Sequence, residues 1–69
     1  MTEEGFRSST QYLVEKYISD AGISKKILKD IDLFGSSGAK EILSDICENS
    51  GDIEDSDGAL IKDISFNFI

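Results

Sequence analysis

Histidine, proline and tryptophan are absent from this 69-residue sequence, and cysteine occurs once, as Cys47. Without histidine the chain lacks the commonest general base and metal ligand, and a single thiol forms neither an internal disulfide nor a zinc cluster. We therefore expect no catalytic residue and no metal site. Because Cys47 falls on the apolar side of a predicted helix, we expect it to be a buried core residue rather than a nucleophile.

Positive charge is also scarce. Seven Lys and Arg stand against 14 Asp and Glu, which gives a formal net charge of −7. Such an excess repels phosphate backbones and anionic lipid heads, so we expect no nucleic-acid or membrane ligand and instead a basic protein surface as partner. No apolar run approaches the roughly 18 residues of a membrane span, and the acidic start is unlike a basic signal peptide. These features predict a cytoplasmic protein.

The length allows one small domain, residues 1–69, with little room for a deep cavity. We expect a monomer whose chemistry, if any, takes place at its surface. The spacing of the apolar residues predicts an all-α fold, a small bundle of three to four helices. No partner strand is visible for any segment, and an isolated strand would have nothing to pair with.

The first predicted helix covers about residues 9–21, after an N-terminal arm at residues 1–8. A glycine, Gly22, follows the last apolar position as helix-ending glycines do. The segment 23–34 has a looser spacing and fits either a short helix opened by Ser24 or a loop pinned by apolar residues. The apolar face of the first helix consists of Leu13, Val14, Tyr17, Ile18 and Ala21.

The clearest amphipathic pattern follows the turn Gly35-Ser36-Ser37-Gly38 and ends near Asn49. Its apolar positions are Ala39, Ile42, Leu43, Ile46 and Cys47, and its acidic positions are Glu41, Asp45 and Glu48. Residues 52–58 then form an acidic loop. The final segment, 59–69, fits a helix or a strand, and we predict a short helix that frays over residues 67–69.

Two motifs in these segments have features of ligand-binding sites. Aligned on an EF-hand calcium loop, the acidic loop places Ile53 and Ile64 at the first and twelfth positions, where acidic ligands are required, so a solvated loop is the better interpretation. Ser36 and Ser37 precede a predicted helix, where backbone N–H groups favour an attached anion such as a phosphate. The simpler interpretation is that one of these serines caps the helix.

The sequence resembles the acyl and peptidyl carrier proteins over nearly its whole length. The resemblance lies in an acidic first helix, the lead-in Asp32-Leu33-Phe34-Gly35 before two serines, an acidic amphipathic helix and an acidic loop at residues 51–55. It implies a covalent 4′-phosphopantetheine on Ser37, counting from the lead-in, or on Ser36, aligning the helix that follows. The residue before Ser37 is Ser36 where the family has Asp, and Gly38 follows where the family has Leu. An unmodified carrier-like protein therefore stays an alternative.

The function implied by this resemblance is that of a carrier, which holds an acyl or aminoacyl group as a thioester and presents it to other enzymes. Its partners would be a phosphopantetheinyl transferase and the basic surfaces of biosynthetic enzymes. Glu41, Asp45 and Glu48 would bind those surfaces, although a solvated polar face would look the same.

Two other classes of protein stay open. One is a small acidic inhibitor or DNA mimic without a prosthetic group. The other is a peptide substrate whose tail, residues 64–69, is modified by an enzyme. A disordered tail would favour the substrate hypothesis, and burial of Phe66 and Phe68 would count against it.

Overall fold

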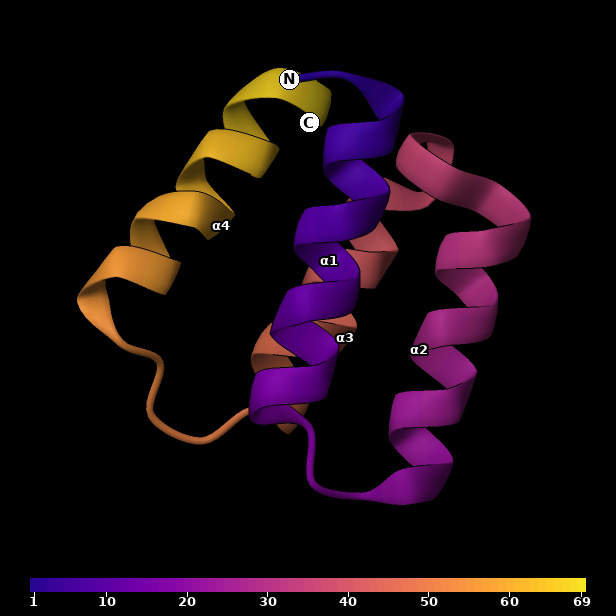
Figure 1. Cartoon of the computed structure of the whole chain (residues 1–69), viewed down its shortest axis with the longest axis vertical. Coiled ribbons are helices and arrows are strands. Elements are labelled where there is room, and N and C mark those ends of the chain that lie inside the picture. Colours follow the sequence, from indigo (N-terminus) through magenta and orange to yellow (C-terminus); the bar gives the residue numbers. More distant parts are fainter.

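The computed structural model describes all 69 residues. The chain forms four α-helices and one 3-10 turn, and it has no strand (Figure 1). The predicted all-α bundle is therefore confirmed. α1 is flanked by α2 and α4, α3 lies behind it in this view, and the two termini meet at one end. The elements are α1 (Glu3–Tyr17), α2 (Ala21–Phe34), the 3-10 turn η1 (Gly35–Gly38), α3 (Ala39–Asn49) and α4 (Asp55–Phe68).

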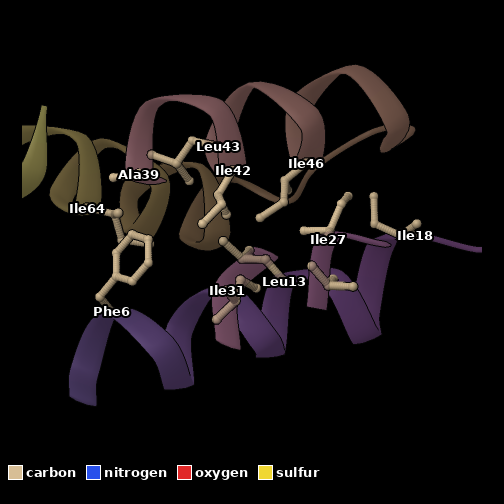
Figure 2. Close-up of a cluster of buried hydrophobic side chains, with 11 residues drawn as sticks. Phe6, Leu13, Ile18, Ile27, Ile31, Ala39, Ile42, Leu43, Ile46 and Ile64 are labelled. Carbon is tan, nitrogen blue, oxygen red and sulfur yellow. The ribbon is translucent and has the colours of Figure 1, made fainter. Parts of the chain in front are cut away.

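One apolar core lies between the helices, and Figure 2 shows its side chains converging from all four of them. Phe6 projects from α1 towards Ile64 of α4 and stacks edge-on against Phe68, with ring centroids 5.1 Å apart. The buried Thr10 hydroxyl donates to the Phe6 carbonyl oxygen at 2.7 Å, so it adds no unpaired polar group to the core. The fully buried residues of the core include Phe6, Leu13, Val14, Ile27, Ile31, Ile46 and Ile64.

α1 begins six residues before the predicted boundary of 9, so the predicted arm at residues 1–8 is wrong. Thr2 is the N-cap, and its side chain accepts a hydrogen bond from the Gly5 N–H at 3.0 Å. Glu3 and Glu4 occupy the first turn, where negative charge is favourable. The helix ends at Tyr17 rather than residue 21, because Asp20 caps α2 by accepting from the Ile23 N–H.

Of the two alternatives for residues 23–34, the helix is correct, and it extends from Ala21 to Phe34. Gly22 therefore lies inside the first turn of α2 and does not end α1, and Ser24 is not the cap. Ile27 and Ile31, four residues apart, supply the buried side of α2. The alternative of a loop pinned by apolar residues is therefore wrong for this segment.

α3 matches its prediction except at Cys47, which is exposed rather than part of the core. Leu43 lies one turn earlier on the same side of α3 and is buried. That side of the helix is thus covered at Leu43 and open to solvent at Cys47. A periodicity argument gives the direction of a side chain, whereas its burial depends on how far the neighbouring helices extend.

The predicted acidic loop at 52–58 is shorter than expected, because α4 begins at Asp55. The final segment is a helix to Phe68, which decides between helix and strand. Phe68 packs on Phe6, while Phe66 is 89% exposed. The ordered helix removes the disorder that would have favoured the peptide-substrate hypothesis. No helix of the chain has the length and apolar character needed to cross a bilayer.

Candidate functional site

The two serines lie in η1, the turn that connects α2 to α3. Gly35 opens this turn with a φ of 55°, a conformation that glycine adopts without strain. The N-cap of α3 is Gly38, and no side chain caps that helix. The prediction that one of the serines caps α3 is therefore wrong. Both serines precede the cap, and their hydroxyl groups have other partners.

Ser36 is bound to the first turn of α1 through the Glu3 carboxylate. The Ser36 backbone N–H donates to Glu3 Oε2 at 2.9 Å, and the Ser36 hydroxyl donates to Glu3 Oε1. One carboxylate therefore accepts both donors of the residue. The Glu3 side chain thus connects the first turn of α1 to η1.

Arg7 holds Glu3 in this position. Its Nε donates to Glu3 Oε2 at 3.3 Å, and its Nη1 donates to the Asp32 carbonyl oxygen, near the end of α2, at 3.2 Å. Both side chains lie directly over Gly35: a Cβ built there would overlap Glu3 Oε2 and would be 2.6 Å from Arg7 Nη2. The turn therefore requires glycine for its conformation and also for the space that these side chains occupy.

The hydrogen bonds from the Ser36 hydroxyl and N–H, with the Arg7 guanidinium beside them, hold the pKa of the Glu3 carboxyl below its ordinary value of 4.5. Glu3 is consequently ionised at neutral pH. A general base works best with a pKa near the working pH, so Glu3 is poorly matched to removing the Ser36 proton. The pair fits a structural contact better than a nucleophile with its base.

Ser37 is exposed and lies on the rim of an open hollow of about 350 Å³. Its hydroxyl donates to the Phe34 carbonyl oxygen at 2.6 Å and makes no hydrogen bond to a charged group. Leu33 and Phe34 are 60% and 56% exposed at the end of α2. The hollow is lined by Phe34, Ser37, Gly38, Lys40 and Glu41, so an exposed hydroxyl lies beside an aromatic ring, an ammonium group and a carboxylate.

The three acidic residues of α3 differ in availability. Glu41 lines the hollow, and Glu48 is exposed without an ion pair. Asp45 is half-buried and pairs with Lys26 of α2 at 3.3 Å. The predicted acidic face therefore presents two free carboxylates, and the third helps to join α2 to α3.

A second polar cluster, which the sequence analysis did not identify, joins α1 to the start of α4. Asp57 is only 5% exposed and accepts hydrogen bonds from three side chains of α1: Tyr12 at 2.9 Å, Lys16 at 2.9 Å, and Tyr17. Lys16 also pairs with Glu54 at 2.9 Å. Every donor in this cluster has an acceptor, as a buried polar network requires.

Neither cluster resembles a metal centre, since no three Asp, Glu or Cys side chains of the chain gather in a possible ligand group. Signals for both clusters exist in the sequence but are weak. Glu3 and Arg7 are spaced i, i+4 after a capping threonine, and Tyr12, Lys16 and Tyr17 all lie within six residues. What the sequence does not show is that each group faces a residue more than 30 positions away.

Comparisons with protein-family models, with curated proteins and with solved structures found no match for this chain. The fold itself defines the class, a small acidic four-helix bundle. Within that class, the junction of α2 and α3 combines an exposed hydroxyl, an open hollow and exposed apolar side chains, and it is the candidate functional site.

Proposed function

We propose that this protein is a carrier that holds an acyl or aminoacyl group as a thioester on a 4′-phosphopantetheine arm attached to Ser37. The observation that carries the proposal is the position of Ser37, which is exposed and lines the hollow beside α3. Lys40 lines the same hollow and its ammonium group forms no ion pair, so this side chain is available to a phosphodiester there.

The attachment reaction belongs to a partner transferase that uses coenzyme A. The Ser37 oxygen forms a bond to the phosphorus of the phosphopantetheine, and the pyrophosphate bond of coenzyme A breaks. Adenosine 3′,5′-bisphosphate leaves, and the hydroxyl proton passes to a base of the transferase. This chain supplies the acceptor oxygen and a docking surface, and it needs no general base of its own.

The net charge of −7 supports a basic partner surface, and the free carboxylates of Glu41 and Glu48 are the groups that would bind it. Glu41 lies at the hollow, so a partner docked there would also reach Ser37. Asp45 contributes less in this proposal because Lys26 already neutralises it. Biosynthetic enzymes that accept thioesters are the partners that such a carrier would serve in the cytoplasm.

The proposal is tested by intact mass after incubation with coenzyme A and a broad-specificity phosphopantetheinyl transferase. We expect the wild-type protein and Ser36→Ala to gain one phosphopantetheine and Ser37→Ala to gain none. Glu41→Lys is expected to slow loading more than Glu15→Lys, the same charge change near the opposite end of α1. A wild-type protein that gains no mass would remove the carrier function.

A specific observation favours a second candidate if loading fails. Leu33 and Phe34 expose apolar surface at the end of α2, and Phe34 lines the hollow together with Glu41. An acidic inhibitor that binds a basic enzyme surface would use this combination without any modification of Ser37. The binding partner would then depend on Phe34 and be indifferent to Ser37→Ala.

A further inference from the structure

We infer that Glu3 selects the modified serine: its carboxylate shields Ser36 and leaves Ser37 as the acceptor of the arm. The inference rests on the proposed function, because it concerns which of two adjacent hydroxyl groups receives the phosphopantetheine. Both serines belong to the same four-residue turn, so sequence position alone does not distinguish them.

The contacts of the two hydroxyl groups differ in charge. The Ser36 hydroxyl donates to the ionised Glu3 carboxylate, whereas the Ser37 hydroxyl donates to the neutral carbonyl of Phe34. A phosphodiester on Ser36 would bring a second negative charge against Glu3 and replace the hydrogen bond that Ser36 now donates. The Ser37 hydroxyl has no carboxylate as its hydrogen-bond partner, and the hollow beside it is lined by Lys40 as well as by Glu41.

Two further hydrogen bonds hold the Glu3 carboxylate at Ser36, and a cap orders the helix turn that carries it. Arg7 donates to its Oε2, the Ser36 N–H donates to the same oxygen, and Thr2 caps the helix turn on which Glu3 lies. The Arg7 guanidinium is also bound to the Asp32 carbonyl oxygen. Arg7 therefore connects Glu3 to the end of α2 through its Nε and Nη1 groups.

Glu4 provides a matched control for Glu3. It lies in the same first turn of α1, is exposed, and makes no side-chain hydrogen bond or ion pair. Replacing either residue with alanine removes one negative charge from the same region, but only Glu3→Ala releases Ser36. An effect of net charge or of helix stability would be similar in the two variants.

The test compares loading of Ser37→Ala, Glu3→Ala/Ser37→Ala and Glu4→Ala/Ser37→Ala by the same transferase, with the modified residue mapped by fragmentation mass spectrometry. We expect the arm to appear on Ser36 only in the variant that lacks Glu3. Equal loading of Ser36 in all three proteins would overturn the inference. So would an unloaded Glu3→Ala/Ser37→Ala protein under conditions in which the wild type is loaded on Ser37.

A wild-type protein that is not loaded would instead overturn the proposed function. Shielding is then measured by amide hydrogen exchange, because the Ser36 N–H donates to Glu3. We expect exchange at Ser36 to be roughly tenfold faster in Glu3→Ala than in Glu4→Ala, as loss of a charged hydrogen bond implies. Equal exchange rates in the two variants would overturn the shielding itself.

Discussion

Two carboxylates connect α1 to later parts of the chain, and they do so in opposite surroundings. At one end of α1, the Glu3 side chain is 51% exposed and accepts hydrogen bonds from Ser36 and Arg7. Towards the other end of α1, Asp57 of α4 is 5% exposed and accepts hydrogen bonds from Tyr12, Lys16 and Tyr17. Each carboxylate joins segments more than 30 residues apart, and each has its pKa lowered by its donors.

The difference in burial predicts that loss of the Asp57 contacts destabilises the fold more than loss of the Glu3 contacts. Removal of one partner from a buried network leaves the other groups without water or protein to bind, whereas solvent replaces a lost partner at an exposed site. Asp57 therefore contributes mainly to the stability of the bundle. Glu3 can be changed with little loss of stability, so it is the better position for controlling access to a neighbouring hydroxyl.

The largest expected effect that tests this comparison is the loss of stability caused by Asp57→Ala. It leaves the hydroxyls of Tyr12 and Tyr17 and the Lys16 ammonium without their common acceptor, and the attachment of α4 to α1 weakens. Glu3→Ala changes the net charge by the same amount but exposes its former partners to water. Urea denaturation of the two variants should give a clearly lower midpoint for Asp57→Ala, and equal midpoints would contradict the distinction.

The second effect is a loss of stability in acid. Hydrogen bonds from Tyr17 and Lys16 hold the pKa of Asp57 below its ordinary value of 3.8, so the unfolded chain binds more protons than the folded one at low pH. The contribution of Asp57 is present above pH 3.8 and is lost as the pH falls through the lower folded value. Urea midpoints measured from neutral pH to pH 3 should fall less steeply in Asp57→Asn than in the wild-type protein, and equal slopes would contradict this contribution of Asp57.

Tyr17 makes the stability of the fold depend on pH in the opposite direction, with a loss at alkaline pH. Burial, and then its hydrogen bond to Asp57, raise the pKa of Tyr17 above its ordinary value of 10.0. Its contribution to stability is therefore complete below pH 10.0 and is lost as the pH rises through the higher folded value. Tyr17→Phe should reduce the alkaline loss of stability and leave the Glu3 contact unchanged.

The smallest effect concerns the glycine beneath Glu3. Gly35→Ala forces alanine into a positive φ and against the Glu3 and Arg7 side chains, and it should lower the free energy of unfolding by roughly 1–3 kcal/mol. Gly58→Ala is the matched control, because Gly58 lies in α4 with open space around it, and the change should stabilise by about 0.5–1 kcal/mol. Changes of the same sign in both variants would contradict the account of the turn.

The helical fold and the buried side of α3 could be predicted because both follow from local periodicity. Ile42, Leu43 and Ile46 repeat at helical spacing, and all three are buried. The start of α1 was missed because Thr10 interrupts the apolar pattern between Phe6 and Leu13. Its hydroxyl is satisfied by the Phe6 carbonyl within the helix, so a polar residue occupies a core position at little cost.

The candidate site was predictable only in its residues. The sequence marked Ser36 and Ser37 as adjacent and nearly equivalent, and it placed them at a helix start that would favour an anion. The tertiary contacts separate them, because Glu3 approaches from 33 residues away and binds one serine only. Asp57 was assigned to a solvated loop, since nothing local shows that two tyrosines and a lysine of α1 surround it.

The sequence by itself determined an acidic all-α bundle, the apolar side of α3 and the pair of serines before it, since charge and periodicity act over a few residues. Only the tertiary structure decided which serine is open, which carboxylate is buried and why Cys47 is exposed. Those properties depend on neighbours brought together by packing of the core. Exposure and hydrogen bonding at a given residue are set by the whole fold, and a pattern within one helix does not contain them.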